Sequence, residues 1–116
     1  MDPAMNAALS ALGAFGTKLD VTANNIANVE TEGFKKSRAI LQEGDQSGVT
    51  VTLSRVDTPG ALIPSQDGTE KMSESSNVDL AEEMVNLKTT QYGFQANIKT
   101  IKAEGEMLGS LFDILA

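Results

Sequence analysis

The sequence of 116 residues contains no histidine, no cysteine and no tryptophan, and its aromatic residues are one tyrosine and four phenylalanines. Without imidazole and thiol groups, the chain lacks the commonest general base, the thiolate nucleophile, disulfide bonds and the nitrogen and sulfur ligands of zinc sites. The paired carboxylates Glu82-Glu83 and Glu104/Glu106 remain, and we interpret them as solvated charges on a helix. We therefore expect no catalytic residue, no cofactor and no metal. An enzyme that uses carboxylates is the least favoured class of function.

The charge balance and the lack of long apolar runs exclude two further classes. The chain has 9 basic and 16 acidic residues, a net charge of −7, which argues against a nucleic-acid partner. No run of about 18 apolar residues occurs, so we expect no transmembrane segment. Met1–Leu19 lacks a basic region followed by an uninterrupted apolar one, so we expect no cleaved signal peptide. The start Met1–Ala4 fits a native N-terminus and a cloning remnant equally well.

Apolar residues recur with heptad spacing in residues 1–34, which predicts a helix with a narrow apolar seam. Gly33 can adopt the left-handed conformation that follows a last helical turn, so we expect the helix to end there. Phe34 is then placed to fold back onto the apolar face. The seam consists of Met5, Leu12, Leu19 and Ile26, with Ala8, Phe15, Thr22 and Val29 at the intervening positions.

Residues 77–116 continue the same register and predict one long helix of roughly 60 Å, more than a compact domain of this size needs. Ser75, Ser76 and Asn77 are candidates for its N-cap. Towards the C-terminus the apolar residues surround most of the helix, which favours packing between several copies. The seam consists of Leu80, Met84, Leu87, Gln91, Phe94, Ile98, Ile101, Gly105, Leu108, Phe112 and Leu115.

The middle segment, residues 35–76, predicts a short β-hairpin followed by an irregular stretch. Strands are indicated at 38–41 and 49–56, joined by a turn around Gly44-Asp45 and Gly48. We therefore expect one structural domain that is mainly α with a small β element. Its N- and C-terminal helices pair as an antiparallel-type coiled coil around this short hairpin and irregular middle segment.

Several polar and small residues inside the predicted helices need an explanation. Asn24, Asn25 and Asn28 each cost roughly 0.5 kcal/mol relative to Ala, and they form either a solvated face or hydrogen bonds across a helix–helix contact. Glycines at 93, 105 and 109 indicate either close helix contacts or chance. The basic cluster Lys35-Lys36-Ser37-Arg38 is most simply a soluble strand edge, with contact to an acidic neighbour as the second interpretation.

Two segments of the chain resemble one known family. Ala23–Asn28, followed by Thr31-Glu32-Gly33-Phe34-Lys35, is similar to the N-terminal signature of the bacterial flagellar basal-body rod and hook proteins. Glu74–Leu80, with Glu83–Leu87 and the later Gln95-Ala96-Asn97 and Glu106-Met107-Leu108, resembles the C-terminal signature of the same family. The short middle segment resembles the proximal-rod type, whereas the signatures are closer to the distal-rod and hook version.

The resemblance implies a non-enzymatic subunit of the flagellar rod. Such a subunit assembles through its terminal helices into a hollow tube that transmits torque and encloses the export channel. Implied partners are copies of the chain, other rod and hook proteins and the flagellar type III export apparatus. The implied location is the periplasmic rod of the basal body, reached without a cleaved signal peptide. A generic secreted or cytosolic coiled-coil adaptor that recruits a partner helix is the alternative.

The residues expected to pack subunits combine the two helix seams with the two signatures. They are Leu12, Phe15, Leu19, Asn24, Asn25, Ile26, Asn28, Gly33, Phe34, Asn77, Val78, Leu80, Met84, Leu87, Phe94, Ile98, Ile101, Leu108 and Phe112.

Overall fold

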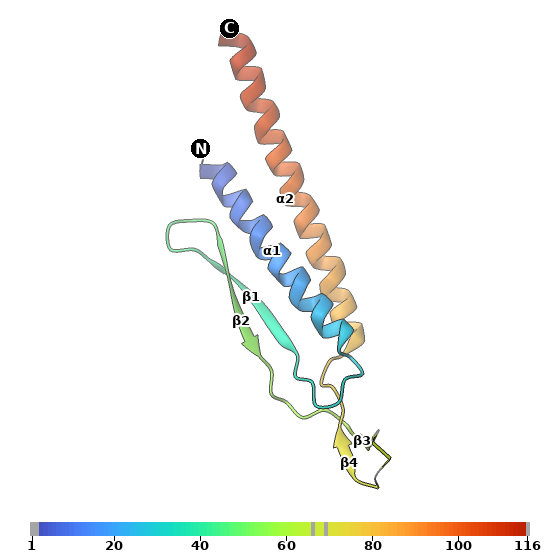
Figure 1. The fold of residues 1–116 in the computed structure, drawn as a ribbon. Helices are drawn as coiled ribbons and strands as arrows, with labels where there is room; N and C mark the ends of the chain where they lie inside the picture. The colour runs from blue at the N-terminus through green and yellow to red at the C-terminus, as the bar shows by residue number, and fades with distance from the viewer. Residues whose placement is uncertain (1–2, 66, 69, 116) are drawn as a thin grey trace.

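The computed structural model describes residues 3–65, 67–68 and 70–115, and it forms an elongated molecule of 77 × 25 × 18 Å. Two long helices run side by side in opposite directions, and a β-hairpin lies along the other side of the first helix (Figure 1). A second, smaller hairpin lies near the end where the helices are connected. The elements in chain order are α1 (Pro3–Ala27), β1 (Ser37–Glu43), β2 (Val49–Arg55), β3 (Leu62–Pro64), β4 (Met72–Glu74) and α2 (Leu80–Leu115).

The predicted division into two terminal helices around a small β element is confirmed, and two of the buried residues of α1, Ala8 and Thr22, belong to the predicted seam. The buried residues of α1 are Ala8, Ala11, Ala14, Thr22 and Asn25, and those of α2 are Glu83 and Thr90. The larger seam residues of α1, from Leu12 to Ile26, are only half-buried. The buried positions of α1 are thus small or polar, and the ring of Phe15 packs against Gly93 of α2.

A glycine in α2 lies against an aromatic ring of α1. A Cβ atom on Gly93 would lie 2.8 Å from Cε1 and Cζ of Phe15, so a larger residue here requires the ring to shift. The hypothesis of a close helix contact is thus confirmed at Gly93. At Gly105 and Gly109 a Cβ atom would meet nothing within 4 Å, so these two glycines make no close contact within the described chain.

The predicted hairpin is present as β1 and β2, which pair antiparallel from Ser37↔Arg55 to Glu43↔Val49. Its turn is closed by a hydrogen bond from the Gly44 amide to the Gly48 carbonyl, and Gly48 has a φ of +84° that favours glycine. The Val49 amide donates to Oγ of Ser10 at 2.9 Å. This bond fixes the turn end of the hairpin on α1.

The stretch predicted as irregular contains a second hairpin, so that part of the prediction was wrong. β3 and β4 pair antiparallel through Leu62↔Glu74, Ile63↔Ser73 and Pro64↔Met72. Each strand has only three residues, and β3 ends in a proline. Such short strands show no alternating pattern from which the hairpin could be predicted.

Both helix boundaries facing the middle segment also differ from prediction. α1 ends at Ala27, and turns follow it, although Gly33 does adopt the expected left-handed conformation with a φ of +72°. α2 begins at Leu80, where the Asp79 carboxylate caps the helix by accepting from the amides of Ala81 and Glu82. The predicted caps Ser75, Ser76 and Asn77 precede this turn and make other contacts.

Large apolar side chains remain exposed over much of α2. Val85, Tyr92 and Phe112 are between 64% and 69% exposed, and Leu115 is 81% exposed. Only three apolar residues, all alanines, are buried in the described part of the chain. No helix of the described residues is long and apolar enough to cross a membrane.

Candidate functional site

The two sequence signatures meet in space where the helices connect to the hairpins. The segment after α1, the segment after β2 and the segment ahead of α2 converge there (Figure 1). We refer to residues 33–37, 56–60 and 74–77 as the joint. The side chains of Asn25, Asn77 and Glu74 connect these segments to one another and to α1.

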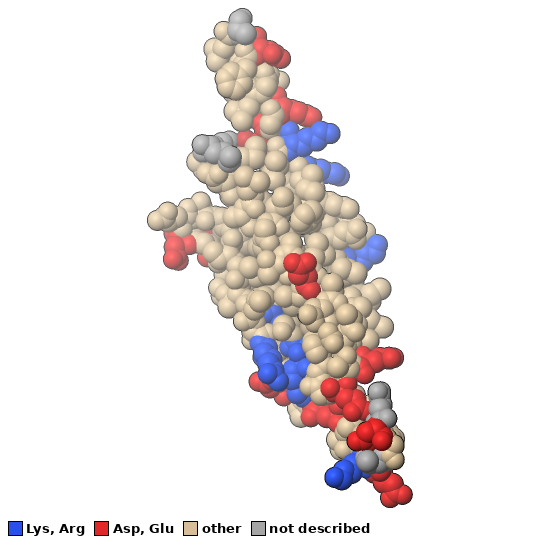
Figure 2. Space-filling view, viewed as in Figure 1, with Lys and Arg blue, Asp and Glu red and all other residues tan. Residues whose placement is uncertain are grey.

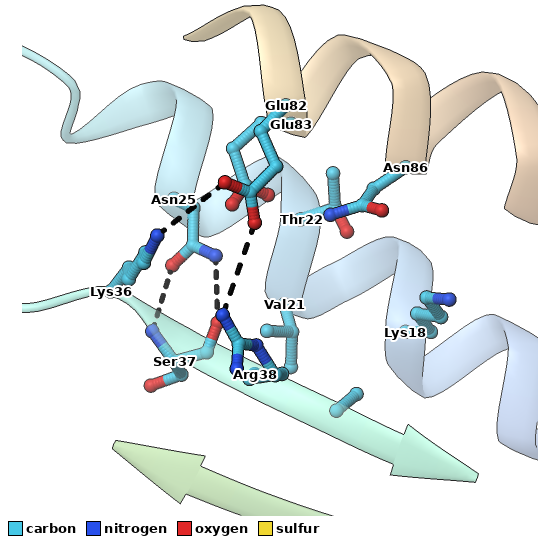
Figure 3. Close-up of a pocket in the computed structure, with 11 residues that line it drawn as sticks. Lys18, Val21, Thr22, Asn25, Lys36, Ser37, Arg38, Glu82, Glu83 and Asn86 are labelled. Carbon is cyan, nitrogen blue, oxygen red and sulfur yellow. Dashed lines mark hydrogen bonds and ion pairs between the residues drawn. The ribbon is translucent and has the colours of Figure 1, made fainter. Parts of the chain in front are cut away.

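Asn25 attaches the start of β1 to α1. Its Nδ2 donates to the Ser37 carbonyl at 2.8 Å, and its Oδ1 accepts from the Ser37 amide at 3.1 Å (Figure 3). The side-chain amide thus takes the place of a neighbouring strand, and the residue is only 2% exposed. The predicted hydrogen bond across the helix–helix contact was wrong for Asn25, because its partner lies in β1.

The other two asparagines of this segment bond to each other along the helix end. Nδ2 of Asn28 donates to the carbonyl and to Oδ1 of Asn24, at 2.9 and 2.8 Å. Asn24 is exposed and Asn28 is half-buried. These contacts are local, so the solvated interpretation holds for Asn24 and no cross-helix bond is present.

Asn77 ties three segments together ahead of α2. Its Oδ1 accepts from the Lys36 amide at 2.7 Å, and its Nδ2 donates to the carbonyls of Val56 and Thr58 at 2.8 and 3.0 Å. Its own amide donates to the Phe34 carbonyl at 3.3 Å. One side chain therefore holds the base of the hairpin against the segment that leads into α2.

Glu74 connects the second hairpin to the joint. Its carboxylate accepts a hydrogen bond from Nζ of Lys35, and at 2.8 Å one from the Gly60 amide. These two bonds hold the pKa of Glu74 below its usual value of 4.5. The bond from Lys35 has the larger effect. A side chain at position 60 would collide with the Ser75 carbonyl, so the turn before β3 requires Gly60.

A small polar cavity of about 30 Å³ lies beside the joint, between α1, β1 and α2 (Figure 3). Lys36 and Arg38 approach the Glu82 carboxylate at 3.7 and 3.9 Å across it. Glu83, which also lines this cavity, is only 3% exposed. The volume suits about one water molecule. The basic cluster thus has acidic neighbours within its own chain.

The residues expected to pack subunits fall into two groups. The first group consists of Asn25, which is buried, and of residues that are half-buried. The second group consists of residues that are exposed and therefore accessible to other molecules. The half-buried residues are Leu12, Phe15, Leu19, Ile26, Asn28, Phe34, Asn77, Val78, Leu87, Phe94 and Ile101. The exposed residues are Asn24, Gly33, Leu80, Met84, Ile98, Leu108 and Phe112.

Sequence reasoning missed the roles of Glu74, Lys35 and Gly60 in this region. Its interpretation of Glu83 as a solvated charge was wrong, because Glu83 is only 3% exposed. Glu74 and Lys35 stand inside the two signatures, but no spacing rule indicates that a residue of one bonds to a residue of the other. Gly60 stands in the turn sequence Thr58-Pro59-Gly60, which was the available signal.

Comparison with known proteins finds matches to two separate segments of the chain. A family model described as "Flagella basal body rod protein" matches residues 5–35. A second model, described as "Flagellar basal body rod FlgEFG protein C-terminal", matches residues 69–114. The chain belongs to the flagellar rod and hook protein family. The two matched parts of this rod and hook protein are the segments that form α1 and α2 with their flanking halves of the joint.

Individual relatives of this rod and hook protein align over a limited part of their length. The flagellar hook protein FlgE of Escherichia coli is 29% identical over 91 residues, which are 77% of this chain and 23% of the relative. The flagellar basal-body rod protein FlgG of Bacillus subtilis is 46% identical over 55 residues, 47% of this chain and 19% of the relative. The chain thus spans less than a quarter of the length of these relatives.

Proposed function

We propose that this chain is a structural subunit of the flagellar basal-body rod and that it self-assembles through its terminal helices into a hollow helical tube. The observation that carries the proposal is the apolar end of α2, which projects past α1 (Figure 1). Leu108, Phe112 and Leu115 continue the side of the helix that faces α1, yet they are 42%, 69% and 81% exposed. Other copies would cover this surface in an assembly.

The thin core supports the same proposal. The buried apolar residues of the described chain are Ala8, Ala11 and Ala14, which contribute little hydrophobic free energy. A chain with so small a core gains stability when a neighbouring copy covers its exposed residues. The functional object is then the polymer, which transmits torque along its length and encloses an export channel.

Rod rather than hook is favoured by the matches and by the size of the middle segment. Both matching family models carry the rod in their descriptions, and the rod protein FlgG is 46% identical over 55 residues, compared with 38% over 60 residues for the hook protein FlgE of Borreliella burgdorferi. The short segment 35–76 favours the proximal-rod type. We infer that the partners are copies of the chain, other rod and hook proteins and the export apparatus, and that the location is the periplasmic rod.

An adaptor that binds a partner helix is the second candidate, and one observation favours it. Met84, Val85 and Tyr92 form an exposed apolar surface on α2 that could receive a single helix of another protein. An adaptor of this kind forms a complex of fixed size, whereas a rod subunit forms a polymer.

Deletion of the coding segment tests the proposed function in the cell. We expect swimming to be lost and electron microscopy to show basal bodies with an incomplete rod, and the wild-type segment supplied in trans should restore both. Normal swimming together with complete rods in the deletion strain would contradict the proposal.

A further inference from the structure

The loop of the second hairpin contains a pair of residues that occurs once in the sequence. Asp67 is followed by Gly68, and no other aspartate and no asparagine of the chain precedes a glycine. The remaining aspartates are followed by residues with a side chain, for example Asp45 by Gln46. Glycine has no Cβ atom, so its amide nitrogen is the one least obstructed for a reaction with the preceding aspartate side chain.

The pair lies in the loop beyond the paired part of the hairpin. The three residue pairs of the β3–β4 ladder precede and follow this loop, and the Ser65 amide donates to the Lys71 carbonyl at 3.0 Å. Asp67 and Gly68 lie within the loop that this bond closes. The main chain at the pair can therefore change conformation without the loss of a ladder hydrogen bond.

Both residues are open to solvent. Asp67 and Gly68 are exposed, and a Cβ atom placed on Gly68 would meet nothing within 4 Å. Gly68 has a φ of +82°, a conformation that favours glycine. Figure 2 shows acidic side chains on the surface at the end of the molecule where the second hairpin lies. Water and a modifying enzyme can reach the pair without unfolding of the chain.

These observations point to a site of covalent modification. We propose that Asp67 converts to isoaspartate in the folded protein, with the Gly68 amide nitrogen as nucleophile and Cγ of Asp67 as electrophile. The exposed product is then a substrate for a carboxyl methyltransferase that uses S-adenosylmethionine. This inference goes beyond the proposed function and does not depend on it.

The conversion has two steps that balance without an oxidant or a reductant. In the first step the Gly68 nitrogen attacks Cγ of the Asp67 carboxyl group and an N–Cγ bond forms. The nitrogen loses its proton, the carboxyl hydroxyl group leaves, and the two depart as water, so that a cyclic succinimide remains. In the second step water attacks the succinimide. Attack at Cγ restores aspartate, whereas attack at the main-chain carbonyl carbon of Asp67 breaks its bond to the Gly68 nitrogen and yields isoaspartate.

Isoaspartate changes the loop in two ways. The main chain now runs through Cβ and Cγ of residue 67 and is longer by one atom, and the former main-chain carbonyl becomes a free carboxylate. An oxygen of this carboxylate takes the methyl group of S-adenosylmethionine, which forms an ester and releases S-adenosylhomocysteine. Glu74 is bound to the Gly60 amide at 2.8 Å at the far end of β4, so we expect the structural change to stay within the loop.

Incubation of the full chain at neutral pH and physiological temperature for several weeks tests the proposal. Peptide mapping by mass spectrometry locates isoaspartate, and a purified protein isoaspartate methyltransferase with radiolabelled S-adenosylmethionine measures it. We expect isoaspartate and methyl label at position 67 and none at Asp45, which is also exposed beside a hairpin turn but precedes Gln46. Isoaspartate at position 67 that takes up label only after unfolding would contradict the accessibility of the product.

The same incubation in urea separates the effect of the folded loop from that of the sequence. Because the pair is exposed and outside the ladder, the folded and the unfolded chain should form isoaspartate at position 67 at similar rates. A reaction that proceeds in the unfolded chain and is lost in the folded one would show that the loop protects Asp67, and it would overturn the proposal.

Two variants each change one reacting group. Asp67→Glu keeps the charge but would have to close a larger ring, so the methyl label should be lost. Gly68→Ala adds a methyl group beside the attacking nitrogen, where nothing lies within 4 Å, and should lower the label. The control Glu70→Gln changes an exposed acidic residue of the same loop and should leave the label unchanged. Undiminished label in Asp67→Glu would place the isoaspartate elsewhere and contradict the assignment.

Discussion

At the scale of single residues, side-chain amides form the backbone hydrogen bonds that a third strand would form in a larger sheet. Asn25 satisfies both backbone groups of Ser37, and Asn77 accepts from Lys36 next to it. Buried backbone groups without partners are costly, so these asparagines allow a lone two-stranded hairpin to lie against a helix. Their contribution depends on their position and cannot be replaced by apolar packing.

Replacement of Asn25 by leucine tests this role. Asn25→Leu leaves the amide and carbonyl of Ser37 without their partner, so we expect the free energy of unfolding to fall by about 3 kcal/mol. The matched change Asn24→Leu affects an exposed residue one position earlier and should alter stability by less than about 0.5 kcal/mol. Urea unfolding followed by circular dichroism measures both, and equal losses would contradict the assigned role of Asn25.

At the scale of elements, one contact between α1 and α2 depends on a glycine. Gly93 of α2 accommodates the ring of Phe15 of α1. Close approach of this kind leaves little space for added atoms.

Two glycine substitutions of the same kind should therefore have opposite effects. In Gly93→Ala the new methyl group collides with Phe15, and we expect a loss of stability of about 1–2 kcal/mol. In Gly105→Ala nothing lies within 4 Å of the new atom, so the higher helix propensity of alanine should add up to about 1 kcal/mol. Thermal unfolding of the two variants measures whether each substitution raises or lowers the stability. Stabilisation by Gly93→Ala would show that the register of the helices is different.

The joint makes the attachment of the second hairpin sensitive to acid. Lys35 and the Gly60 amide bind the charged form of Glu74, which lowers its pKa in the folded state. The resulting stabilisation is fully present above the unfolded value near 4.5 and is lost as the pH falls through the folded value. The carboxylate of Glu74 is the group that changes charge in this linkage.

A pH series should reveal this linkage. The wild type should be more stable than Glu74→Gln at pH 7, and the difference should shrink as the pH falls below about 4.5. The Gly60 amide should shift in NMR spectra over the same range, because its acceptor loses charge. The control Glu70→Gln changes an exposed residue of the same hairpin. A difference between wild type and Glu74→Gln that does not change with pH would contradict the linkage.

The sequence predicted these elements unevenly, and the reasons are physical. The alternation of Val49, Val51 and threonines reports a half-buried strand, and the heptads report two helices, so both features were predictable. The contact of Glu74 with Lys35 joins residues far apart in the chain, and only the folded backbone brings them together. The fully buried helix positions are small or polar, such as Thr90 and Glu83, so a search for large apolar residues finds the flanks of the contact instead.

At the scale of the whole molecule, an extended shape and only three buried alanines as apolar core of the described residues fit the proposed role as one subunit of a larger structure. The shortage of aromatic residues is no handicap when neighbouring copies complete the burial. The projecting end of α2 has no contact with α1, so we expect it to contribute to assembly and little to the stability of the monomer.

Sedimentation velocity over a wide range of concentration tests the central claim most directly. The account predicts that the mass of the wild-type chain grows continuously with concentration, without a preferred oligomer, as expected for head-to-tail assembly. The variant Leu108→Ser/Phe112→Ser should suppress this growth while the unfolding of the monomer stays nearly unchanged. A constant monomer or a single small oligomer of the wild-type chain at all concentrations would contradict a self-assembling rod subunit.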